Sequence, residues 1–494
     1  MTSDLDVGTV VAVGGYLCLV ALIAYYGYSR TVDEADFLVA GREVGPIVGA
    51  GTLLASQISA STVIGAVGIH YLFGLGFIWV WVGILVGWLV ALAFVAPQLR
   101  RFSGMTVPDF VGTRYADDGA DGDYARAIST VLIVAVFTLF LTAQYTAGSL
   151  VFQRLLGVPE PVGIVLTAAV AVAYTAFGGM RASVVTDFLQ AVVLVGGLAL
   201  VVPVALAEIG GIGTLVTRLE AIDPALVGQA FPLPRITGFV VASAVGIAAA
   251  PVEISRFYAM RDEETVRTAI RISLVAQGVI ALSVATLGLS ARVLFPELQT
   301  PDMAAFVLTG QLLGPVLGTL FVLAVLSAIL STIDSVMLVS SAGIAHDVYA
   351  RLIRPEASER RKLRVNRAAV LLVGALPVVL AFYRELFGGL ITLITLLNLS
   401  LQGSMLFVPV LLGMHWRRAT TAGGIGAMVA GFFTVVAWHV GTELTGVVPP
   451  AVAATIGDPV VPGLVVSFVV LVGLSLATAP PSDRSTEPFF SEAE

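Results

Sequence analysis

Cysteine and histidine are scarce in this chain of 494 residues. Cys18 is the only cysteine, which excludes a disulfide framework and a thiolate metal cluster. The four histidines are far apart in the sequence and lack the spacing of metal ligands: His70, His346, His415 and His439. We therefore expect each histidine to be a packed or interfacial residue rather than a metal ligand.

Charged residues are scarce as well, at 12% of the chain against 57% hydrophobic residues. A mean hydropathy of +0.97 is too high for a soluble protein and indicates a polytopic membrane protein. The sequence has no cluster of basic residues of the kind that binds nucleic acid. It also lacks a Walker-type loop and the HExxH and GxSxG motifs, which argues against an ATP-driven pump and against a membrane enzyme.

Long apolar runs are what the chain has in abundance. Thirteen runs approach the length of about 20 residues that a helix needs to cross a bilayer. They lie near residues 7–28, 45–74, 76–97, 126–153, 160–178, 180–206, 236–255, 268–295, 314–345, 365–383, 386–414, 419–440 and 459–479. The sequence before the first run lacks the basic region of a signal peptide, so we expect that run to remain as an anchor. Residues 480–494 are expected to be a disordered tail.

Basic residues are distributed unevenly over the connecting loops. With the N-terminus outside, 21 of the 26 basic residues fall in cytoplasmic segments. Because cytoplasmic loops carry an excess of Arg and Lys, this bias predicts an outside N-terminus and a cytoplasmic C-terminus in the plasma membrane.

A polar stretch, residues 55–62, interrupts the second apolar run. Its side chains include Gln57, Ser59, Ser61 and Thr62. Polar groups in mid-membrane are tolerated where the helix unwinds beside a cavity, and such oxygen-rich segments hold coupling ions and substrate in secondary transporters. The alternative is that these hydroxyls bond back to their own helix and pack against a neighbour.

A second interruption, around Pro251, falls where an inverted repeat of two five-helix halves requires it. The expected organisation is an anchor helix and loop over 1–44, a first repeat over 45–206, a second repeat over 207–414, and two further helices over 415–479. The broken helices would then be the first and sixth of the core.

The eighth core helix carries small and hydroxyl residues on one face. Ala328, Ser331, Thr332 and Ser335 recur at spacings of three and four residues. Two neighbouring hydroxyls could bind a dehydrated monovalent cation, with carbonyls of the unwound segment completing the shell. A small-residue seam between helices is the alternative reading.

Acidic residues inside apolar runs are candidates for function because they are costly there without a partner. Asp187 could bind a cation, relay a proton or pair with Arg181. Asp334, in the eighth core helix, is likewise a candidate for a functional role. Glu253 and Arg256 could pair with each other or be solvated. The amides of Asn398 and Gln402, one helical turn apart, could face substrate or join helices.

Taken together, several short motifs resemble those of the sodium:solute symporter family. In order they are Phe37–Arg42, Ala55–Ala60, Thr106–Phe110 with Arg114 and Tyr115, Gly178–Ala182, Thr186-Asp187 with Gln190, Ser331–Ser335 and Gly413–Trp416. The resemblance implies an all-α leucine-transporter-type core with one extra helix before it and two after it. It also implies Na⁺-driven uptake of a small organic solute by alternating access, with no obligatory protein partner beyond the surrounding lipid.

The resemblance also implies where ions bind. The main sodium site would use the carbonyls of Ala55, Ile58 and Ala328 with the hydroxyls of Ser331 and Thr332. A second site, found in some members, would use Asp187, Ser331, Asp334 and Ser335. Solute would bind beside the two breaks, near Gln57, Ser59, Ser61, Thr62, Pro251, Asn398 and Gln402.

The substrate is less well defined. Residues 174–184, Ile222–Pro224 and the prolines Pro296 and Pro301 with their acidic neighbours look most like the pantothenate branch, and the proline branch is the nearest rival. The proline branch has an acid beside the first break where this chain has Gln57, which argues mildly against proline. A proton-coupled symporter of the same fold, with Asp187 and Asp334 as carriers, is the closest alternative function. A membrane-embedded sensor is a further one.

Overall fold

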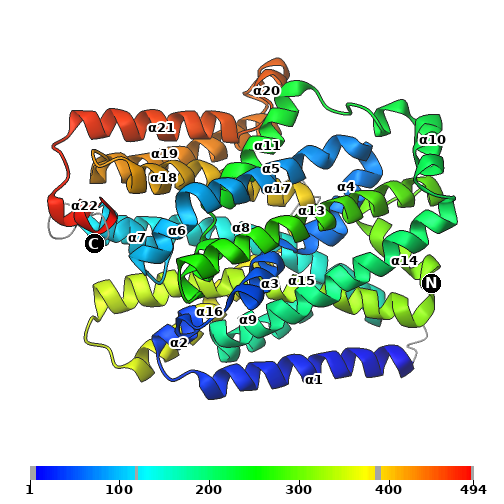
Figure 1. Ribbon diagram of the computed structural model, residues 1–494, viewed down its shortest axis with the longest axis horizontal. Helices are drawn as coiled ribbons and strands as arrows, with labels where there is room; N and C mark the ends of the chain where they lie inside the picture. Colours follow the sequence, from blue (N-terminus) through cyan, green and yellow to red (C-terminus); the bar gives the residue numbers. More distant parts are fainter. Residues whose placement is uncertain (1–6, 117–120, 384–390, 491–494) are drawn as a thin grey trace.

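The computed structural model describes residues 7–116, 121–383 and 391–490, and these form helices joined by turns (Figure 1). The first part of the chain contains α1 (Val7–Arg30), α2 (Glu34–Val39), α3 (Pro46–Gln57), the π-helical turn η2 (Ser61–Gly65), α4 (Ala66–Phe73), α5 (Ile78–Val90), α6 (Ala96–Phe102), α7 (Val107–Arg114), α8 (Asp121–Leu156) and α9 (Glu160–Ile209). The second part contains α10 (Ile212–Ile222), α11 (Leu233–Ala248), α12 (Pro251–Ala259), α13 (Glu263–Leu294), α14 (Ala304–Leu312), α15 (Gly314–Ala342), the π-helical η7 (Gly343–Ile353), α16 (Glu359–Ala381), α17 (Ile391–Gln402), the π-helical turn η9 (Gly403–Phe407), α18 (Val408–His415), α19 (Thr421–His439), α20 (Pro450–Ile456), α21 (Val460–Ala477) and α22 (Asp483–Phe490).

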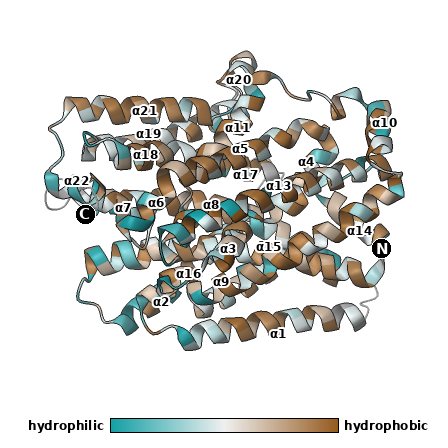
Figure 2. Cartoon of the chain, viewed as in Figure 1, coloured by the Kyte–Doolittle hydropathy of each residue, from teal (hydrophilic) through white to brown (hydrophobic). Residues whose placement is uncertain are grey.

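Eleven helical segments of the described residues are long and apolar enough to cross a membrane. Two of them, Ser61–Phe102 and Glu160–Ile209, each include parts of two predicted runs, which accounts for the thirteen runs expected from the sequence. Residues 386–390 of the eleventh run lie outside the described part of the chain. The long helices are mostly apolar along their length, while α10 and α22, at opposite ends of the bundle, carry more polar residues (Figure 2).

The helices form one bundle in which α3, α8 and α15 lie between peripheral helices. In Figure 1, α1 runs along one edge, and α19 and α21 run along the opposite edge. Close approach of α5 and α11 depends on glycine, because a Cβ at Gly83 or Gly87 would lie 2.6 Å from a carbonyl oxygen of α11. Glycine therefore lets α5 and α11 pack backbone to backbone, as is common between membrane helices.

Both predicted helix breaks are present. The first broken helix consists of α3, which ends at Gln57, and η2, which begins at Ser61. The second is interrupted at Ala249 and Ala250, where the backbone leaves the helical region before Pro251 starts α12. Proline suits the first turn of a helix because its missing N–H would have no helical partner there. The two breaks lie next to each other in the fold because α3 contacts α12.

The predicted turn at Gly178-Gly179 is a sharp kink within α9. Gly179 has φ +59° and ψ −169°, a conformation that is essentially restricted to glycine. A Cβ at this position would also lie 2.8 Å from the ring of Phe37. The kink divides one long helix into the two spans that the sequence predicted.

Replacing Gly179 with alanine is therefore expected to destabilise the protein by about 1–3 kcal/mol or more, because strain and a ring clash add. Gly196→Ala, on the same helix, is the control because its added Cβ would meet nothing within 4 Å. The measurement is the thermal unfolding midpoint of the detergent-solubilised protein. Equal midpoints for the two variants would contradict the role given to the kink.

The end of the chain differs from the expected disordered tail. Residues 483–490 form α22, and the ring of Phe489 lies 5.1 Å from that of Phe102 and 5.3 Å from that of Phe110. Residues 491–494 lie outside the described part. Phe489, together with Phe490, whose ring lies 5.7 Å from the guanidinium of Arg114, explains why this polar segment docks onto α6 and α7.

Candidate ion and solute site

The end of α3 frees carbonyl oxygens for a ligand. In a continuous helix the N–H of Ser59 would bond the carbonyl of Ala55, but here it donates to the hydroxyl of Thr62 at 3.3 Å. The N–H of Thr62, which would bond the carbonyl of Ile58, donates instead to the carbonyl of Ser59 at 3.0 Å. Two of the three carbonyls predicted to bind sodium, those of Ala55 and Ile58, are therefore released from the helical pattern.

The hydroxyls of Ser331 and Thr332, here called the hydroxyl shelf of α15, lie next to the unwound segment after α3. The Oγ of Ser331 lies 3.4 Å from the carbonyl oxygen of Ala55 and 3.1 Å from that of Ala328. The hydroxyl of Thr332 also donates to Ala328, at 3.1 Å. A small cavity lined by Ala55, Ile58, Ala328 and Ser331 separates the two elements. Uncharged oxygens of this kind, buried and converging from two helices, suit a dehydrated Na⁺ ion.

A larger cavity lies beside the two breaks. Its lining includes Gln57, Ser59, Ser61 and Thr62 from the first broken helix. Asn398 and Gln402 of α17 line it as well, whereas Pro251 is buried and does not line it. The cavity therefore brings together most of the predicted solute-binding residues.

The amides of α17 both line the cavity and join helices. The Nδ2 of Asn398 donates to the carbonyl of Val136 on α8 at 2.9 Å, and the side chain of Gln402 donates to Asn398. Ser61 reaches α17 as well, with its Oγ 2.5 Å from that of Thr395. The two readings of these amides, substrate-facing or interhelical, are thus compatible.

Gln144 is a functional candidate that the sequence did not reveal. This buried residue of α8 accepts a hydrogen bond from the N–H of Ala60 at 3.2 Å and so supports the unwound segment. A glutamine in the middle of a long apolar helix was the available signal, but only the packing of α8 against the break gives Gln144 a role.

The buried side chains of α12 do not pair as expected. Glu253 accepts a hydrogen bond from the amide of Gln57, and Arg256 instead contacts Asp187 of α9, with 3.2 Å between Nη2 and Oδ2. Glu253 is only 2% exposed. The expectation that Glu253 and Arg256 pair with each other or are solvated was therefore wrong.

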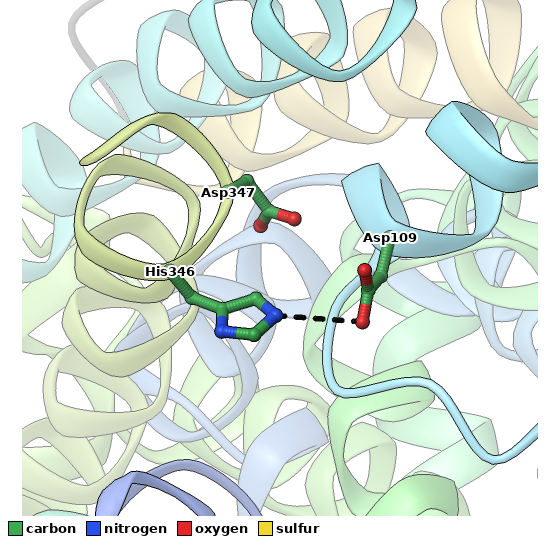
Figure 3. A group of neighbouring side chains, drawn as sticks. All are labelled: Asp109, His346 and Asp347. Carbon is green, nitrogen blue, oxygen red and sulfur yellow. Dashed lines mark ion pairs between the residues drawn. The ribbon is translucent and has the colours of Figure 1, made fainter. Parts of the chain in front are cut away.

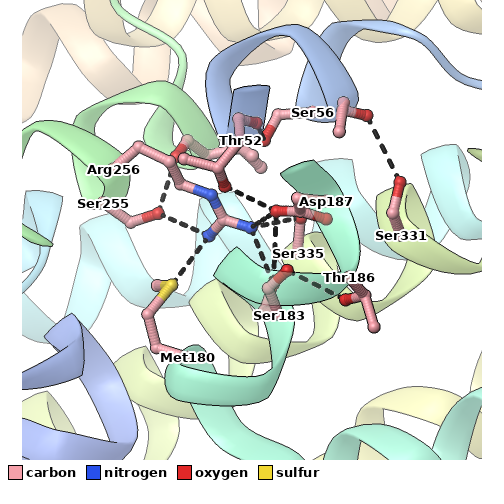
Figure 4. A network of polar contacts seen from close by, with 12 residues as sticks. Thr52, Ser56, Met180, Ser183, Thr186, Asp187, Ser255, Arg256, Ser331 and Ser335 are labelled. Atoms are coloured by element: carbon pink, nitrogen blue, oxygen red, sulfur yellow. Dashed lines mark hydrogen bonds and ion pairs between the residues drawn. The ribbon is translucent and has the colours of Figure 1, made fainter. Parts of the chain in front are cut away.

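Arg256 lies at the centre of a buried polar network (Figure 4). Its Nη2 donates to Ser183 at 3.1 Å and to Ser335 at 2.5 Å in addition to Asp187. Thr52, one turn before Ala55, donates to Asp187 at 2.5 Å. The side chains of Arg256 and Asp187 are both fully buried. The guanidinium thus contacts two of the residues predicted to form the second sodium site.

Asp334 is buried next to this network. Among the described residues no ion pair joins it to Arg256. The suggested pairing of Asp187 with Arg181 is not present either, because Arg181 pairs with Asp36 at 2.6 Å and with Glu43 at 3.2 Å.

A second buried group of charges forms where α7 meets η7 (Figure 3). The ring of His346 lies 3.5 Å from a carboxylate oxygen of Asp109 and 3.2 Å from one of Glu34, and Asp347 is nearby. Arg126 contacts both Asp109 and Asp347. Burial alone would raise the pKa of Asp109, but His346 and Arg126 outweigh it and hold the pKa well below its usual range. Distant sequence positions meet here, so the spacing of the histidines gave no sign of the group.

Relatives of this chain are known over nearly its full length. The osmoregulated proline transporter OpuE of Bacillus subtilis (strain 168) is 26% identical over 98% of both chains. The high-affinity proline transporter PutP of the same organism is 28% identical over 95% of this chain and 98% of its own. Sodium/proline symporter 2 of Staphylococcus saprophyticus is 29% identical over 86% and 84% respectively. These relatives support the proline branch, and they do not support the pantothenate branch that the sequence motifs favoured.

Solved structures resemble the fold. A Na⁺-coupled sialic acid symporter in a substrate-bound outward-open state matches 97% of this chain and 100% of its own with a TM-score of 0.78 at 17% identity. The transporter Mhp1 matches 92% of this chain with a TM-score of 0.57, and MhsT matches 87% with 0.54. The chain therefore has the predicted all-helical leucine-transporter-type fold.

The family model named "Sodium:solute symporter family" matches residues 37–431, which include both broken helices and the hydroxyl shelf of α15. The chain belongs to the sodium:solute symporter family.

Proposed function

We propose that this protein takes up a small proline-like amino acid together with Na⁺ by alternating access. The main support is the position of the freed carbonyl of Ala55 against the Ser331 hydroxyl, close to a cavity that polar residues of the first broken helix line. The proline transporters among the relatives favour a solute of this kind.

The main ion site would use the carbonyls of Ala55, Ile58 and Ala328 and the hydroxyls of Ser331 and Thr332. An ion there would fix the unwound segment against α15. Gln57 and Ser59, on either side of Ile58, line the solute cavity. Ion binding would therefore order part of the solute site, which is a physical basis for coupling because each ligand lowers the ordering cost of the other.

The ion gradient would supply the driving force. Each Na⁺ that enters contributes about 2.3 kcal/mol per 100 mV of membrane potential, plus the concentration term. The positive-inside bias supports an outside N-terminus and a cytoplasmic C-terminus in a plasma membrane.

One Na⁺ per cycle fits the buried charges better than two. A second ion at Asp187 and Ser335 would have to displace the guanidinium of Arg256, which already contacts both. We therefore propose that Arg256 serves as a resident cation at that position and that only the main site binds Na⁺.

Replacing Na⁺ with choline at fixed pH tests the proposal. Uptake of labelled L-proline into proteoliposomes is expected to fall to background, because choline is too large for the oxygen shell. Titrating Na⁺ is expected to give a Hill coefficient of about 1, as a single ion site requires. Uptake that persists in choline would exclude sodium coupling, and a Hill coefficient near two would contradict the single site.

Asp334 favours proton coupling as the second candidate. It is a buried carboxylate in a membrane helix, and the guanidinium beside it is paired with Asp187. Uptake driven by a pH gradient in Na⁺-free buffer, and its loss in Asp334→Asn, would distinguish this function from sodium symport.

A further inference from the structure

The solute cavity carries charge of one sign. Glu253 is the only ionisable side chain among the described residues that line it, and no Arg, Lys or His faces the space. Most of the remaining lining is apolar or aromatic and includes Trp81, Phe137 and Phe140. Such a cavity suits a solute with an apolar body and a positive group.

The Glu253 carboxylate is only half satisfied. One oxygen accepts the hydrogen bond from Gln57, and the other, Oε2, is buried without a hydrogen-bond partner among the described residues. Arg256 follows one turn later on α12, but it contacts Asp187, Ser183 and Ser335 instead. A buried carboxylate without a cation beside it is unfavourable, so a positively charged ligand that reached Oε2 would gain from neutralising it.

We propose that Glu253 binds the ammonium group of the transported solute and thereby selects zwitterionic amino acids over carboxylates that lack an amine. The inference rests on the proposed function and adds a residue that determines substrate class. Charge-assisted hydrogen bonds from an ammonium to a buried carboxylate are short and strong. Anionic solutes without an amine would meet only repulsion, which excludes pantothenate-like acids.

Gln57 makes the site complete. Its amide orients Glu253 from the unwound segment, next to the Ile58 carbonyl proposed to bind sodium. A solute held by Glu253 would therefore lie against the same segment that the ion orders, and the hydrogen bond joins the two broken helices across the cavity.

The test compares L-proline with cyclopentanecarboxylate, which has the same ring size and carboxylate but no nitrogen. Glu253→Gln keeps the size of the side chain and its bond to Gln57 and removes only the charge. Binding is measured as solute-dependent thermal stabilisation in saturating Na⁺. The wild-type protein is expected to prefer proline by about 100-fold or more, and Glu253→Gln is expected to reduce this preference at least about tenfold, in keeping with the strength of bonds to charged groups.

Two further measurements keep the result interpretable. Stabilisation by Na⁺ alone is expected to be the same in Glu253→Gln and wild type, which shows that the variant is folded and retains its ion site. The double variant Gln57→Glu with Glu253→Gln places the carboxylate on the other side of the same hydrogen bond and is expected to regain part of the preference for proline.

An unchanged preference in Glu253→Gln would overturn the proposal. Such a result would also be expected if the carboxylate only carried a proton or only held the two helices together. If neither solute stabilises the wild-type protein in Na⁺, the proposed function fails instead, and this outcome is separate because it does not depend on the variant.

Discussion

Removing either hydroxyl of the α15 shelf is expected to weaken Na⁺ binding by about 10- to 100-fold. Ser331→Ala and Thr332→Ala each delete one oxygen ligand, and an interaction with a charged group contributes about 1.5–3 kcal/mol. The carbonyls of Ala55 and Ala328 remain, so binding is weakened rather than abolished. The apparent Na⁺ affinity is measured by Na⁺-dependent thermal stabilisation and by proline uptake.

Ser340→Ala is the matched control for these variants. Ser340 is a buried serine of the same helix, and its hydroxyl lacks a partner among the described residues. This variant is expected to leave the Na⁺ affinity unchanged within a factor of about two, since removing a hydroxyl without a partner alters no ion ligand. Wild-type Na⁺ dependence in both Ser331→Ala and Thr332→Ala would disprove the proposed main site.

Breaking the Asp187–Arg256 pair is expected to have the largest effect on stability. Both side chains are fully buried, so Arg256→Gln or Asp187→Asn leaves an uncompensated charge and costs about 3–5 kcal/mol. Combining the two substitutions removes both charges and is expected to recover much of the loss. The measurement is the thermal unfolding midpoint in detergent without Na⁺, analysed as a double-mutant cycle.

The exposed pair of Arg267 and Glu263 on α13 is the control for this cycle. Their atoms lie 2.7 Å apart and both side chains are about one-third exposed, so breaking the pair is expected to cost less than about 1 kcal/mol.

If Arg256 is the resident cation, Arg256→Gln should also gain Na⁺-dependent stabilisation and a Hill coefficient above one. Absence of coupling between Asp187 and Arg256, with Na⁺ dependence unchanged, would contradict that role.

Much of the fold was predictable because membrane insertion acts on local sequence. A run of about 20 apolar residues satisfies its backbone only as a helix, so the spans follow from hydropathy alone. The breaks were predictable too, because Pro251 and the polar stretch at 55–62 cannot continue an ordinary apolar helix. Gly178-Gly179 likewise predicted the division of α9.

Side-chain partners were less predictable. Arg181 is only six residues from Asp187, yet Asp187 contacts Arg256 on another helix. The spacing of Glu253 and Arg256 allowed a pair, but each takes its partner from another helix, Glu253 from Gln57 of α3 and Arg256 from Asp187 of α9. The proline branch has an acid at the position of Gln57. In this chain the acid that lines the same cavity is Glu253 of α12.

The amino-acid sequence by itself determined the membrane spans, the two breaks and the hydroxyl face of α15, because each depends on residues that are neighbours along one helix. Only the tertiary structure decided that the two breaks meet, that Arg256 contacts Asp187, and that Glu253 faces the cavity beside the breaks. The physical reason is that in a bundle every buried charge takes its partner from whichever helix packs against it, and packing depends on the whole chain at once.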